Sequence, residues 1–385
     1  MRKAVVIGGS NGIGLAVACK LAREGKHVII VDKCKPDIEE IEFSYKYIQT
    51  DLVDFDAALF EELSKDVEID TLFISAGIGR ICDFDKLCTT EIDKLFKINC
   101  VSITKILRIF YSRIQSNEDF YVGVMGSIAG FVGSPMFSVY SATKASVCKL
   151  IEAINAELES NGYNNRILNV SPGNIKGTAF YGEKNNISLI SVLAEKIVAK
   201  ISERAELYIP DYEEVYKGVI DRYLSDSHRF ALESYEYKKQ SGRAADKSPI
   251  VIGYLSGTFD LFHVGHLNLV RRAKAECDYL IVGVHPDASH KGKETVISFE
   301  ERMAVVGACR YVDKVVPSCS EDSDAWGVHH FHKLFVGSDY KGTERFKNYE
   351  NYFLDKDVEI VYFPYTKEIC STKIREIIKN KKEGK

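Results

Sequence analysis

Two stretches of this sequence, far apart along the chain, each join an apolar run to a helical pattern through a glycine-containing turn. The first is "KAVVIGGSNGIGLAVACKLA" at residues 3–22, and the second is "IVIGYLSGTFDLFHVGHLNLVRRAKA" at residues 250–275. A strand that enters a helix through such a turn opens a parallel sheet covered by helices. Each such unit is expected to be the first strand and helix of its own sheet, and 385 residues are more than a single small core needs. The chain is therefore expected to hold two α/β domains.

Short apolar runs rich in β-branched residues alternate with helical patterns in the amino-terminal half, and the alternation restarts at residue 250. This pattern predicts parallel strands with right-handed helical crossovers. The predicted strands are Ala4–Ile7, His27–Val31, Tyr45–Gln49, Thr71–Ser75, Tyr121–Met125, Arg166–Val170, Ile250–Leu255, Tyr279–Val284, Lys314–Val316, Lys333–Val336 and Glu359–Phe363. Residues 211–248 are charged and tyrosine-rich, which indicates a helix that runs into a linker. We expect two doubly wound parallel sheets: a Rossmann-type domain at 1–235, a linker at 236–248 and a smaller Rossmann-like domain at 249–385.

Composition excludes several classes of partner. A net charge of −4 gives no electrostatic reason to expect nucleic acid. No apolar run approaches the roughly 18–20 residues that cross a bilayer, and the first residues lack the apolar region and cleavage site of a signal peptide. The ten cysteines form no CxxC pair, which favours reduced thiols over a disulfide framework. These features predict a cytoplasmic protein whose partners are small molecules.

The first glycine turn places Gly8, Gly12 and Gly14 between a strand and a helix. Glycines let the backbone approach a pyrophosphate, and the helix N-terminus supplies N–H donors. Asp32 follows at the end of the second predicted strand, where its carboxylate can accept hydrogen bonds from an adenosine ribose and would repel a 2′-phosphate. The pattern favours NAD(H). Because Lys33 and Lys35 lie beside Asp32, NADP(H) stays open as an alternative.

A proton-transfer site is predicted further along the same half. In "VYSATKAS", Tyr140 and Lys144 are four residues apart, which puts them on one helix face. A nearby ammonium lowers the pKa of a phenol, so that tyrosine can exchange a proton nearer neutral pH. Ser127, in "MGSIAG" at the end of a predicted strand, can hydrogen-bond a reacting carbonyl oxygen.

Together these motifs resemble the short-chain dehydrogenase/reductase family over roughly residues 3–205. The resemblance implies that Tyr140 is the acid/base, that Lys144 binds the ribose and tunes Tyr140, that Ser127 polarises the carbonyl, and that Asn99 completes a proton relay. "SAG" at 75–77 departs from the family's Asn-Ala-Gly. The cofactor-binding residues that the resemblance implies are Gly8, Ser10, Asn11, Gly12, Ile13, Gly14, Asp32, Asp51, Leu52, Ala76, Gly77, Pro172, Gly173, Ile175 and Thr178.

The second opening has different chemistry. His263 and His266 in "GTFDLFHVGH" are three residues apart at the start of a helix, so both imidazoles present from one turn. Two imidazoles and helix N–H groups suit a triphosphate rather than a dinucleotide. No Cys or Glu ligand pattern accompanies them, so we predict no resident metal site there.

This motif resembles the HxGH nucleotidyltransferase superfamily, and residues 250–380 resemble its glycerol-3-phosphate cytidylyltransferase family. The resemblance implies attack of a phosphate on the α-phosphorus of CTP, with Mg²⁺ bound to CTP; His263, His266 and Lys293 would be catalytic. The nucleotide-binding residues that it implies are Gly257, Thr258, Phe259, His263, His266, Lys291, Arg302, Thr366, Ser371 and Thr372.

Two further residues are expected on the acceptor side of this second site. Arg310 in "RYVDKVVP" would hold the phosphate of the acceptor, and Asp339 in "VGSDYKGTERF" would contact the acceptor or the metal. The family's late signature begins with an arginine, where this sequence has Tyr365. Adenylyl transfer from ATP, known in related HxGH enzymes, therefore stays open beside cytidylyl transfer.

Fusion of the two halves suggests consecutive steps. A reductase makes a polyol phosphate from a ketose phosphate, with ribulose 5-phosphate or fructose 6-phosphate favoured, and a cytidylyltransferase converts it to a CDP-polyol for bacterial capsule or teichoic-acid-type polymers. Three alternatives stay open: a glycerol phosphate cytidylyltransferase whose reductase acts on dihydroxyacetone or its phosphate, a cytidylyltransferase on a non-catalytic reductase-fold scaffold, and a regulator that senses NADH and CTP. Both resemblances imply a homo-oligomer, a dimer or a tetramer.

Overall fold

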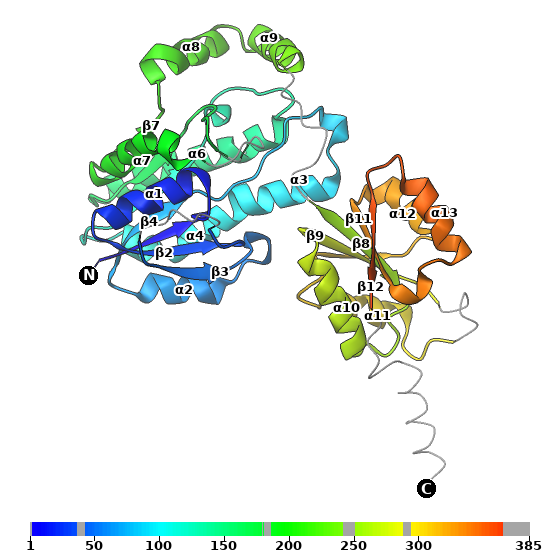
Figure 1. The fold of residues 1–385 in the computed structure, drawn as a ribbon. Helices are drawn as coiled ribbons and strands as arrows, with labels where there is room; N and C mark the ends of the chain where they lie inside the picture. The colour runs from blue at the N-terminus through cyan, green and yellow to red at the C-terminus, as the bar shows by residue number, and fades with distance from the viewer. Residues whose placement is uncertain are drawn as a thin grey trace. The chain divides into compact units, whose positions relative to one another are not determined.

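The computed structural model divides the chain into two compact units, Met1–Lys247 and Ser248–Lys385 (Figure 1). It describes residues 2–36, 43–178, 180, 186–241, 251–287 and 294–364. Each unit is built on its own parallel sheet.

The first unit holds a seven-stranded sheet in the order β3-β2-β1-β4-β5-β6-β7, and every neighbouring pair is parallel. Its strands are β1 Lys3–Ile7, β2 His27–Asp32, β3 Tyr45–Gln49, β4 Ile69–Ile74, β5 Tyr121–Met125, β6 Ile167–Val170 and β7 Leu207–Tyr208. The central strand β4 is buried along its whole length, as expected where helices cover both faces of a parallel sheet. The strand order reverses between β1 and β4.

Helices pack on both faces of this sheet and make two separate cores. One core joins β1 and β2 to α1 and α7, and the other joins the opposite face to α2, α4, α5 and α6. The helices are α1 Gly12–Arg23, α2 Ala57–Lys65, α3 Thr89–Phe96, α4 Ile103–Ile109, α5 Tyr111–Ile114, α6 Ser138–Ser160, α7 Ile187–Ser202, α8 Lys217–Ser225 and α9 Ser227–Gln240. Shorter helical turns are η1 Leu52–Asp54, η2 Phe84–Lys86, η3 Lys97–Ser102, η4 Ile128–Gly130 and η6 Tyr212–Tyr216.

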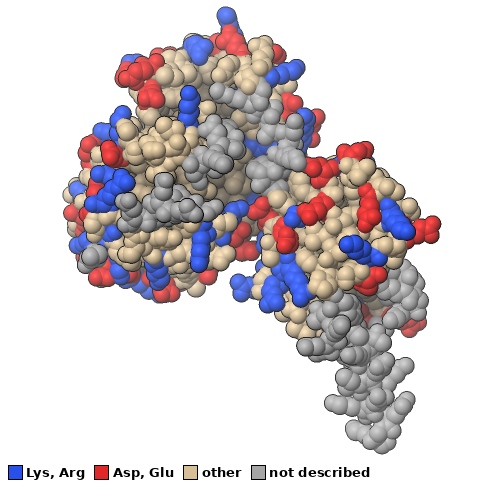
Figure 2. All heavy atoms as spheres, viewed as in Figure 1, with Lys and Arg blue, Asp and Glu red and all other residues tan. Residues whose placement is uncertain are grey.

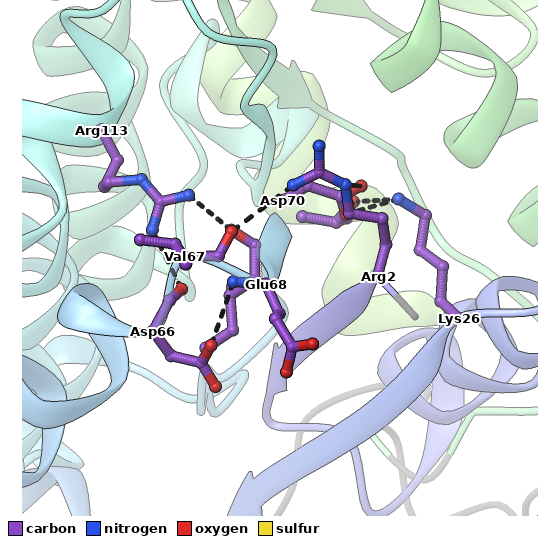
Figure 3. Close-up of polar contacts among 9 residues, drawn as sticks. Arg2, Lys26, Asp66, Val67, Glu68, Asp70 and Arg113 are labelled. Carbon is purple, nitrogen blue, oxygen red and sulfur yellow. Dashed lines mark hydrogen bonds and ion pairs between the residues drawn. The ribbon is translucent and has the colours of Figure 1, made fainter.

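A cluster of charged side chains ties the amino-terminal edge of this sheet together (Figure 3). Arg113 donates to the carbonyl oxygens of Asp66, at 3.0 Å, and Ile69, at 2.8 Å. Lys26, just before β2, pairs with Asp70 of β4 at 2.5 Å. Ligands of doubly wound sheets bind at the opposite, carboxyl edge. We therefore assign this cluster to stability.

The second unit holds a five-stranded parallel sheet in the order β10-β9-β8-β11-β12. Its strands are β8 Ile252–Gly257, β9 Tyr279–Val284, β10 Lys314–Pro317, β11 Lys333–Gly337 and β12 Glu359–Phe363. Its helices are α10 Val264–Ala275, α11 Phe299–Gly307, α12 Asp322–His329 and α13 Glu344–Phe353, with the short η8 at Ser338–Tyr340. Side chains of α10 and α11 pack with β8 and β9 in one core. Here the strand order reverses between β8 and β11.

The two parallel sheets confirm the predicted fold class, and each predicted strand overlaps an observed one. The sequence missed β7, whose two residues are too short for any periodicity to show. The predicted linker also began too early, at 236. In the structure α9 continues to Gln240, and the first compact unit extends to Lys247.

Basic and acidic side chains are interspersed over the face that Figure 2 draws, in keeping with 51 basic and 55 acidic residues. Across the described ranges, no helix has both the length and the apolar character needed to span a bilayer.

Candidate active sites

The first site forms where β1 and β4 end side by side. A Cβ on Gly8 would lie 2.4 Å from the backbone nitrogen of Ala76, and one on Gly14 would lie 2.1 Å from the carbonyl oxygen of Gly8. Gly8 also has a φ of +77°, which side chains rarely tolerate. The glycines therefore let two loops and the N-terminus of α1 meet at one point. Such a cradle is where a pyrophosphate would bind.

Asp32 closes this cradle at the end of β2. Its carboxylate accepts hydrogen bonds from the backbone N–H groups of Ser10, at 2.9 Å, and Lys33, at 2.7 Å. The glycine turn thus orients one carboxylate oxygen through Ser10, and the residue after β2 orients the other. Asp51 follows β3 and caps η1 by accepting from Val53 at 2.9 Å, while the side chain of Leu52 packs in the core. Asp32 and Asp51 thus lie at the carboxyl ends of the neighbouring strands β2 and β3, and their contact with an adenosine stays a prediction.

Tyr140 and Lys144 both lie on α6, as the spacing predicted. The Lys144 ammonium lies 5.7 Å from the centre of the Tyr140 ring and donates to the carbonyl oxygen of Met125 at 2.7 Å. Burial lowers the pKa of Lys144 to about 8, because the apolar surroundings disfavour its charged form. The Tyr140 ring stacks on Phe137, with ring centres 4.1 Å apart.

Asn99 and Ser127 come to the same place from other elements. Asn99 lies on η3, a π-helical turn, and its amide exchanges two hydrogen bonds with the backbone of Ile78, at 2.9 and 2.8 Å. A Cβ on Gly77 would lie 3.4 Å from the Lys144 ammonium and 3.5 Å from the Asn99 amide oxygen, so both polar groups converge there. The Ser127 hydroxyl accepts from Ala129 at 3.2 Å, which leaves its proton for donation to a carbonyl.

The segment after β6 covers this cradle. The carbonyl oxygen of Pro172 accepts from Ile128 at 3.0 Å, which ties the segment to the Ser127 loop. Thr178 bonds to the carbonyl oxygen of Ile175, and its Cβ would lie 3.8 Å from a Cβ on Gly12. The glycine cradle, Asp32 and this cover fit a nicotinamide dinucleotide along the carboxyl edge of the sheet.

The second site forms at the end of β8. His263 caps the N-terminus of α10, and its Nδ1 accepts from the Gly265 N–H at 3.1 Å. Nε2 therefore carries the proton in the neutral imidazole and can donate it to a phosphate. Burial lowers the pKa of His263, which favours this neutral form. The His266 ring stacks on it with ring centres 4.0 Å apart.

Two buried charged residues shape the loops around these histidines. Asp260 accepts from the backbone N–H groups of Val296, at 3.1 Å, and Ile297, at 3.0 Å. Its neighbours Phe259 and Leu261 have φ values of +52° and +50°, a conformation that costs roughly 1–3 kcal/mol per residue and is typical of functional turns.

Arg302 is 1% exposed and donates only to backbone carbonyls. Its four acceptors are Ile297 at 3.1 Å, Thr258 at 2.6 Å, His285 at 2.8 Å and Pro286 at 2.7 Å. The guanidinium thus links three loops of the site, which contain Thr258, His285 and Ile297. The expectation that Arg302 contacts the nucleotide directly has to be corrected, because its donors are turned to these carbonyls.

Other predicted residues of this unit divide by position. The Phe259 side chain is buried in the core, so only its backbone can face a nucleotide. Asp339 folds back over the end of β11, where a Cβ on Gly337 would lie 2.4 Å from its carboxylate. Lys291, Lys293, Tyr365, Thr366, Ser371 and Thr372 lie outside the described residues.

Arg310 is placed away from this site. It follows α11 and precedes β10, at the amino-terminal edge of the sheet. Asp313, three residues on, binds Lys274 at 2.8 Å and accepts from the Leu280 N–H, at the start of strand β9, at 2.6 Å. Because His263 lies at the opposite edge, the predicted contact of Arg310 with an acceptor in the same site has to be corrected.

The comparisons with known proteins divide at the same place as the fold. Residues 2–187 match the family model described as short chain dehydrogenase, and residues 254–377 match the one described as cytidylyltransferase-like. Glycerol-3-phosphate cytidylyltransferase of Bacillus subtilis (strain 168) is 36% identical over 126 residues, 32% of this chain and 92% of that protein. This chain joins a domain that matches the short chain dehydrogenase model to a cytidylyltransferase domain. The second domain belongs to the cytidylyltransferase family.

Other relatives share one domain each. Ethanolamine-phosphate cytidylyltransferase of Dictyostelium discoideum is 41% identical over 98 residues, 24% of this chain and 27% of that protein. The 7beta-hydroxysteroid dehydrogenase of Clostridium sardiniense is 26% identical over 162 residues, 40% of this chain and 62% of that protein. A short-chain dehydrogenase from Sphingobium yanoikuyae, solved with NADPH, is 24% identical with a TM-score of 0.48, over 59% of this chain and 96% of that one.

The structure also places near the two sites residues that the sequence analysis did not single out. Asp260 lies inside the cytidylyltransferase motif itself, and the one carboxylate in "GTFDLFHVGH" was a signal that could have found it. Tyr216, Tyr235 and Lys238 of the dehydrogenase domain lie in the tyrosine-rich stretch after β7, where no motif marks them. No group of three or more His, Cys, Asp or Glu side chains suited to a metal occurs within the described ranges.

Proposed function

We propose that the protein makes a CDP-polyol in two steps, with one step in each domain. The dehydrogenase domain reduces a ketose phosphate with NADH, or alternatively NADPH, to a polyol phosphate. The cytidylyltransferase domain then joins this product to CTP, supplied with Mg²⁺, and releases pyrophosphate. The observation that carries the proposal is the presence in one chain of both polar constellations, Tyr140 with Lys144 and His263 with His266.

In the reduction, the dihydronicotinamide supplies a hydride to the carbonyl carbon of the ketose phosphate. Ser127 donates a hydrogen bond to the carbonyl oxygen, and Tyr140 gives that oxygen a proton, which yields the alcohol. The Lys144 ammonium stabilises the resulting phenolate. Asn99 orders the Ile78 loop beside Gly77 and links this site to solvent through a proton relay. One ketose phosphate, one NAD(P)H and one proton give one polyol phosphate and one NAD(P)⁺.

In the transfer, a phosphate oxygen of the polyol phosphate attacks the α-phosphorus of CTP, and the bond from this phosphorus to pyrophosphate breaks. Negative charge builds on the oxygens around the α-phosphorus. Neutral His263 and its stacked partner His266 donate hydrogen bonds to those oxygens, and the N-terminus of α10 adds its positive dipole end. No covalent intermediate with the protein is required. The lysines at 291 and 293 would hold the phosphates.

The substrate class follows from chemistry shared by the two steps. A reductase that ends in an alcohol and a transferase that consumes a phosphate have a polyol phosphate as their common intermediate. Metabolism already supplies glycerol 3-phosphate, so a dedicated reductase favours a pentitol or hexitol phosphate from ribulose 5-phosphate or fructose 6-phosphate. Such CDP-polyols serve capsule or teichoic-acid-type polymers, made in the bacterial cytoplasm. We keep a homodimer or homotetramer as a prediction.

The test separates the two steps with one variant in each domain. The protein is incubated with CTP, Mg²⁺, NADH or NADPH and, separately, ribulose 5-phosphate, fructose 6-phosphate and dihydroxyacetone phosphate. Nicotinamide absorbance reports reduction, and mass spectrometry reports the CDP-conjugate. Tyr140→Phe should abolish reduction but still convert supplied polyol phosphate, whereas His266→Ala should do the reverse. Loss of both activities in either well-folded variant would contradict two independent sites.

The same assay decides between the alternatives. Turnover of dihydroxyacetone phosphate alone would make the product CDP-glycerol. Conjugation of supplied polyol phosphate with no reduction of any ketose phosphate would leave the dehydrogenase domain as a scaffold. Replacement of CTP by ATP tests adenylyl transfer at the same histidines.

A further inference from the structure

Residues 211–241 of the dehydrogenase domain form a helical extension, made of η6, α8 and α9, beyond the last strand of the sheet (Figure 1). This extension lies outside residues 2–187, which the short chain dehydrogenase model covers. It nevertheless contacts the loops at the carboxyl edge of the sheet, because a Cβ on Gly173, in the segment after β6, would lie 1.6 Å from the Tyr216 hydroxyl. The extension therefore belongs to the surroundings of the dehydrogenase site.

One face of α9 packs on the domain while the rest is exposed. The half-buried positions are Phe230, Ala231, Ser234, Tyr235 and Lys238, which recur at helical spacing. The Tyr235 hydroxyl donates to Asp83, in the loop after β4, at 3.1 Å. Lys238, one turn further on, donates to the Ser134 hydroxyl in the loop before α6 at 2.5 Å. These two hydrogen bonds fix this face of α9 to two separate loops.

The Tyr235 ring joins an apolar cluster around Tyr140. The buried members of this cluster are Ile81, Ala129, Met136, Phe137 and Tyr140, and Phe180 and Tyr235 are partly buried against them. Apart from Tyr235, all of them follow the carboxyl ends of β4, β5 and β6. Ligands of doubly wound sheets bind in the crevice at this edge. The Tyr235 ring therefore forms part of the wall around Tyr140 where a substrate would bind.

The space beside Tyr140 is narrow. A Cβ on Gly79, in the loop after β4, would lie 2.7 Å from the Tyr140 ring and 2.9 Å from the Phe137 ring. Met136 has a φ of +60°, a strained conformation that is typical of ligand-binding loops. A further ring at Tyr235, held on Asp83 by its hydroxyl, leaves little room for a bulky group next to the reacting carbonyl.

We propose that the Tyr235 ring limits the size of the ketone that reacts at Tyr140. The inference rests on the proposed function and narrows its substrate class to open-chain ketones, while ring-bearing ketones are rejected. The carbon chain of an open-chain ketose phosphate is narrow enough to lie beside the ring without moving it.

The contacts of Tyr235 explain how this limit would act. A bulky ketone would have to displace the Tyr235 ring, which would then lose both its packing on the cluster and its hydrogen bond to Asp83. Because this loss arises only with the bulky ketone, it disfavours that ketone relative to the open-chain one. The position of α9 thus becomes a determinant of substrate selectivity.

The first experiment measures steady-state NADH oxidation by the full-length protein and its Tyr235→Ala variant. The two substrates are acetophenone, a methyl ketone with a phenyl ring, and whichever of ribulose 5-phosphate and fructose 6-phosphate the wild type reduces. The wild type should not reduce acetophenone above background. Tyr235→Ala leaves an apolar space that suits an aromatic ring, so its kcat/KM for acetophenone should exceed the wild-type value about tenfold or more.

Three further variants control this experiment. Tyr237→Ala removes the same side chain from an exposed position of α9 and should behave as the wild type. Tyr235→Phe keeps the ring, loses only the hydrogen bond to Asp83, and should still reject acetophenone. If Tyr235→Ala does not fold, Tyr235→Leu makes the same test, because a leucine still packs on the cluster. Acetophenone reduction by the wild type or by Tyr235→Phe, or none by the folded smaller variants, would overturn the size limit.

A second measurement keeps this inference distinct from the proposed function. Acetophenone is titrated calorimetrically into the NADH complexes of the same proteins, each also carrying Tyr140→Phe so that no reduction occurs. Binding should be about tenfold tighter or more with Tyr235→Ala than with Tyr235 or with Tyr237→Ala. Equal affinities would overturn the size limit, even where a ketose phosphate is reduced. Tighter binding in Tyr235→Ala, without reduction of any ketose phosphate by the wild type, would instead overturn the proposed reduction and keep the size limit.

Discussion

Replacing Lys144 by methionine should make the substrate-free dehydrogenase domain more stable at neutral pH while it destroys the site. Lys144 is 3% exposed, and its pKa falls from 10.5 to about 8 on burial. Because one pKa unit corresponds to about 1.4 kcal/mol, keeping this ammonium charged in the folded protein at pH 7 lowers the free energy of unfolding by about 3 kcal/mol. Lys144→Met removes that cost and loses one hydrogen bond to Met125, worth about 1 kcal/mol. The net gain is about 2 kcal/mol.

The sign of this effect depends on pH. The pKa of Lys144 is lower in the folded state, so between about pH 8 and 10.5 the unfolded chain binds more protons, and wild-type stability rises with pH. Above that window the charge penalty is gone, and only the lost hydrogen bond separates the proteins. Lys144→Met should therefore be more stable at pH 7 and less stable, by about 1 kcal/mol, near pH 10.5.

Thermal unfolding followed with and without NADH identifies the transition of the dehydrogenase domain, because the cofactor shifts only that one in the wild type. At pH 7 its midpoint should rise by about 4–8 °C in Lys144→Met, and NADH should no longer raise it further. Lys149→Met, on the exposed side of the same helix, is the control and should change little. A midpoint lowered equally at pH 7 and pH 10.5 would refute the reasoning, since burial would then cost the lysine nothing.

Two other substitutions test the loops of the sites. Arg302→Lys keeps the charge, but an ammonium cannot donate to all four carbonyl oxygens that the planar guanidinium reaches. The substitution should lower the free energy of unfolding of the cytidylyltransferase domain by about 3 kcal/mol, measured with denaturant, and raise the KM for CTP. An unchanged KM would show that the loops keep their positions without this guanidinium. Gly173→Ala puts a methyl group where the Tyr216 hydroxyl lies, so it should lower kcat/KM for reduction about tenfold. Adding Tyr216→Ala to this variant should restore part of the lost kcat/KM. If kcat/KM does not recover, the loss arises from a change in the segment around Gly173 and not from the clash with Tyr216.

Much of both sites could be predicted because their residues are neighbours along the chain. Tyr140 and Lys144 are one turn apart on a helix, and His263 and His266 share the first turn of another, so local spacing places each pair. Gly8 directly follows one strand and Asp32 ends the next, and the apolar runs of both strands are unambiguous. Strand, turn and helix signals of this kind depend on a few consecutive residues, which is why the parallel sheets and the strand ends that carry the sites were also predictable.

Tertiary structure decided where the remaining charged side chains point. Arg302 was expected at the nucleotide and Arg310 at the acceptor's phosphate, but Arg302 is turned inward to backbone carbonyls and Arg310 precedes β10, at the opposite edge of the sheet from His263. Lys238 looked like part of a linker, yet α9 folds back and binds it to Ser134, more than a hundred residues earlier. The sequence shows that a charged side chain is present but not where it points in the fold. Only the packing of distant loops and helices determines whether it meets a carbonyl, solvent or a substrate.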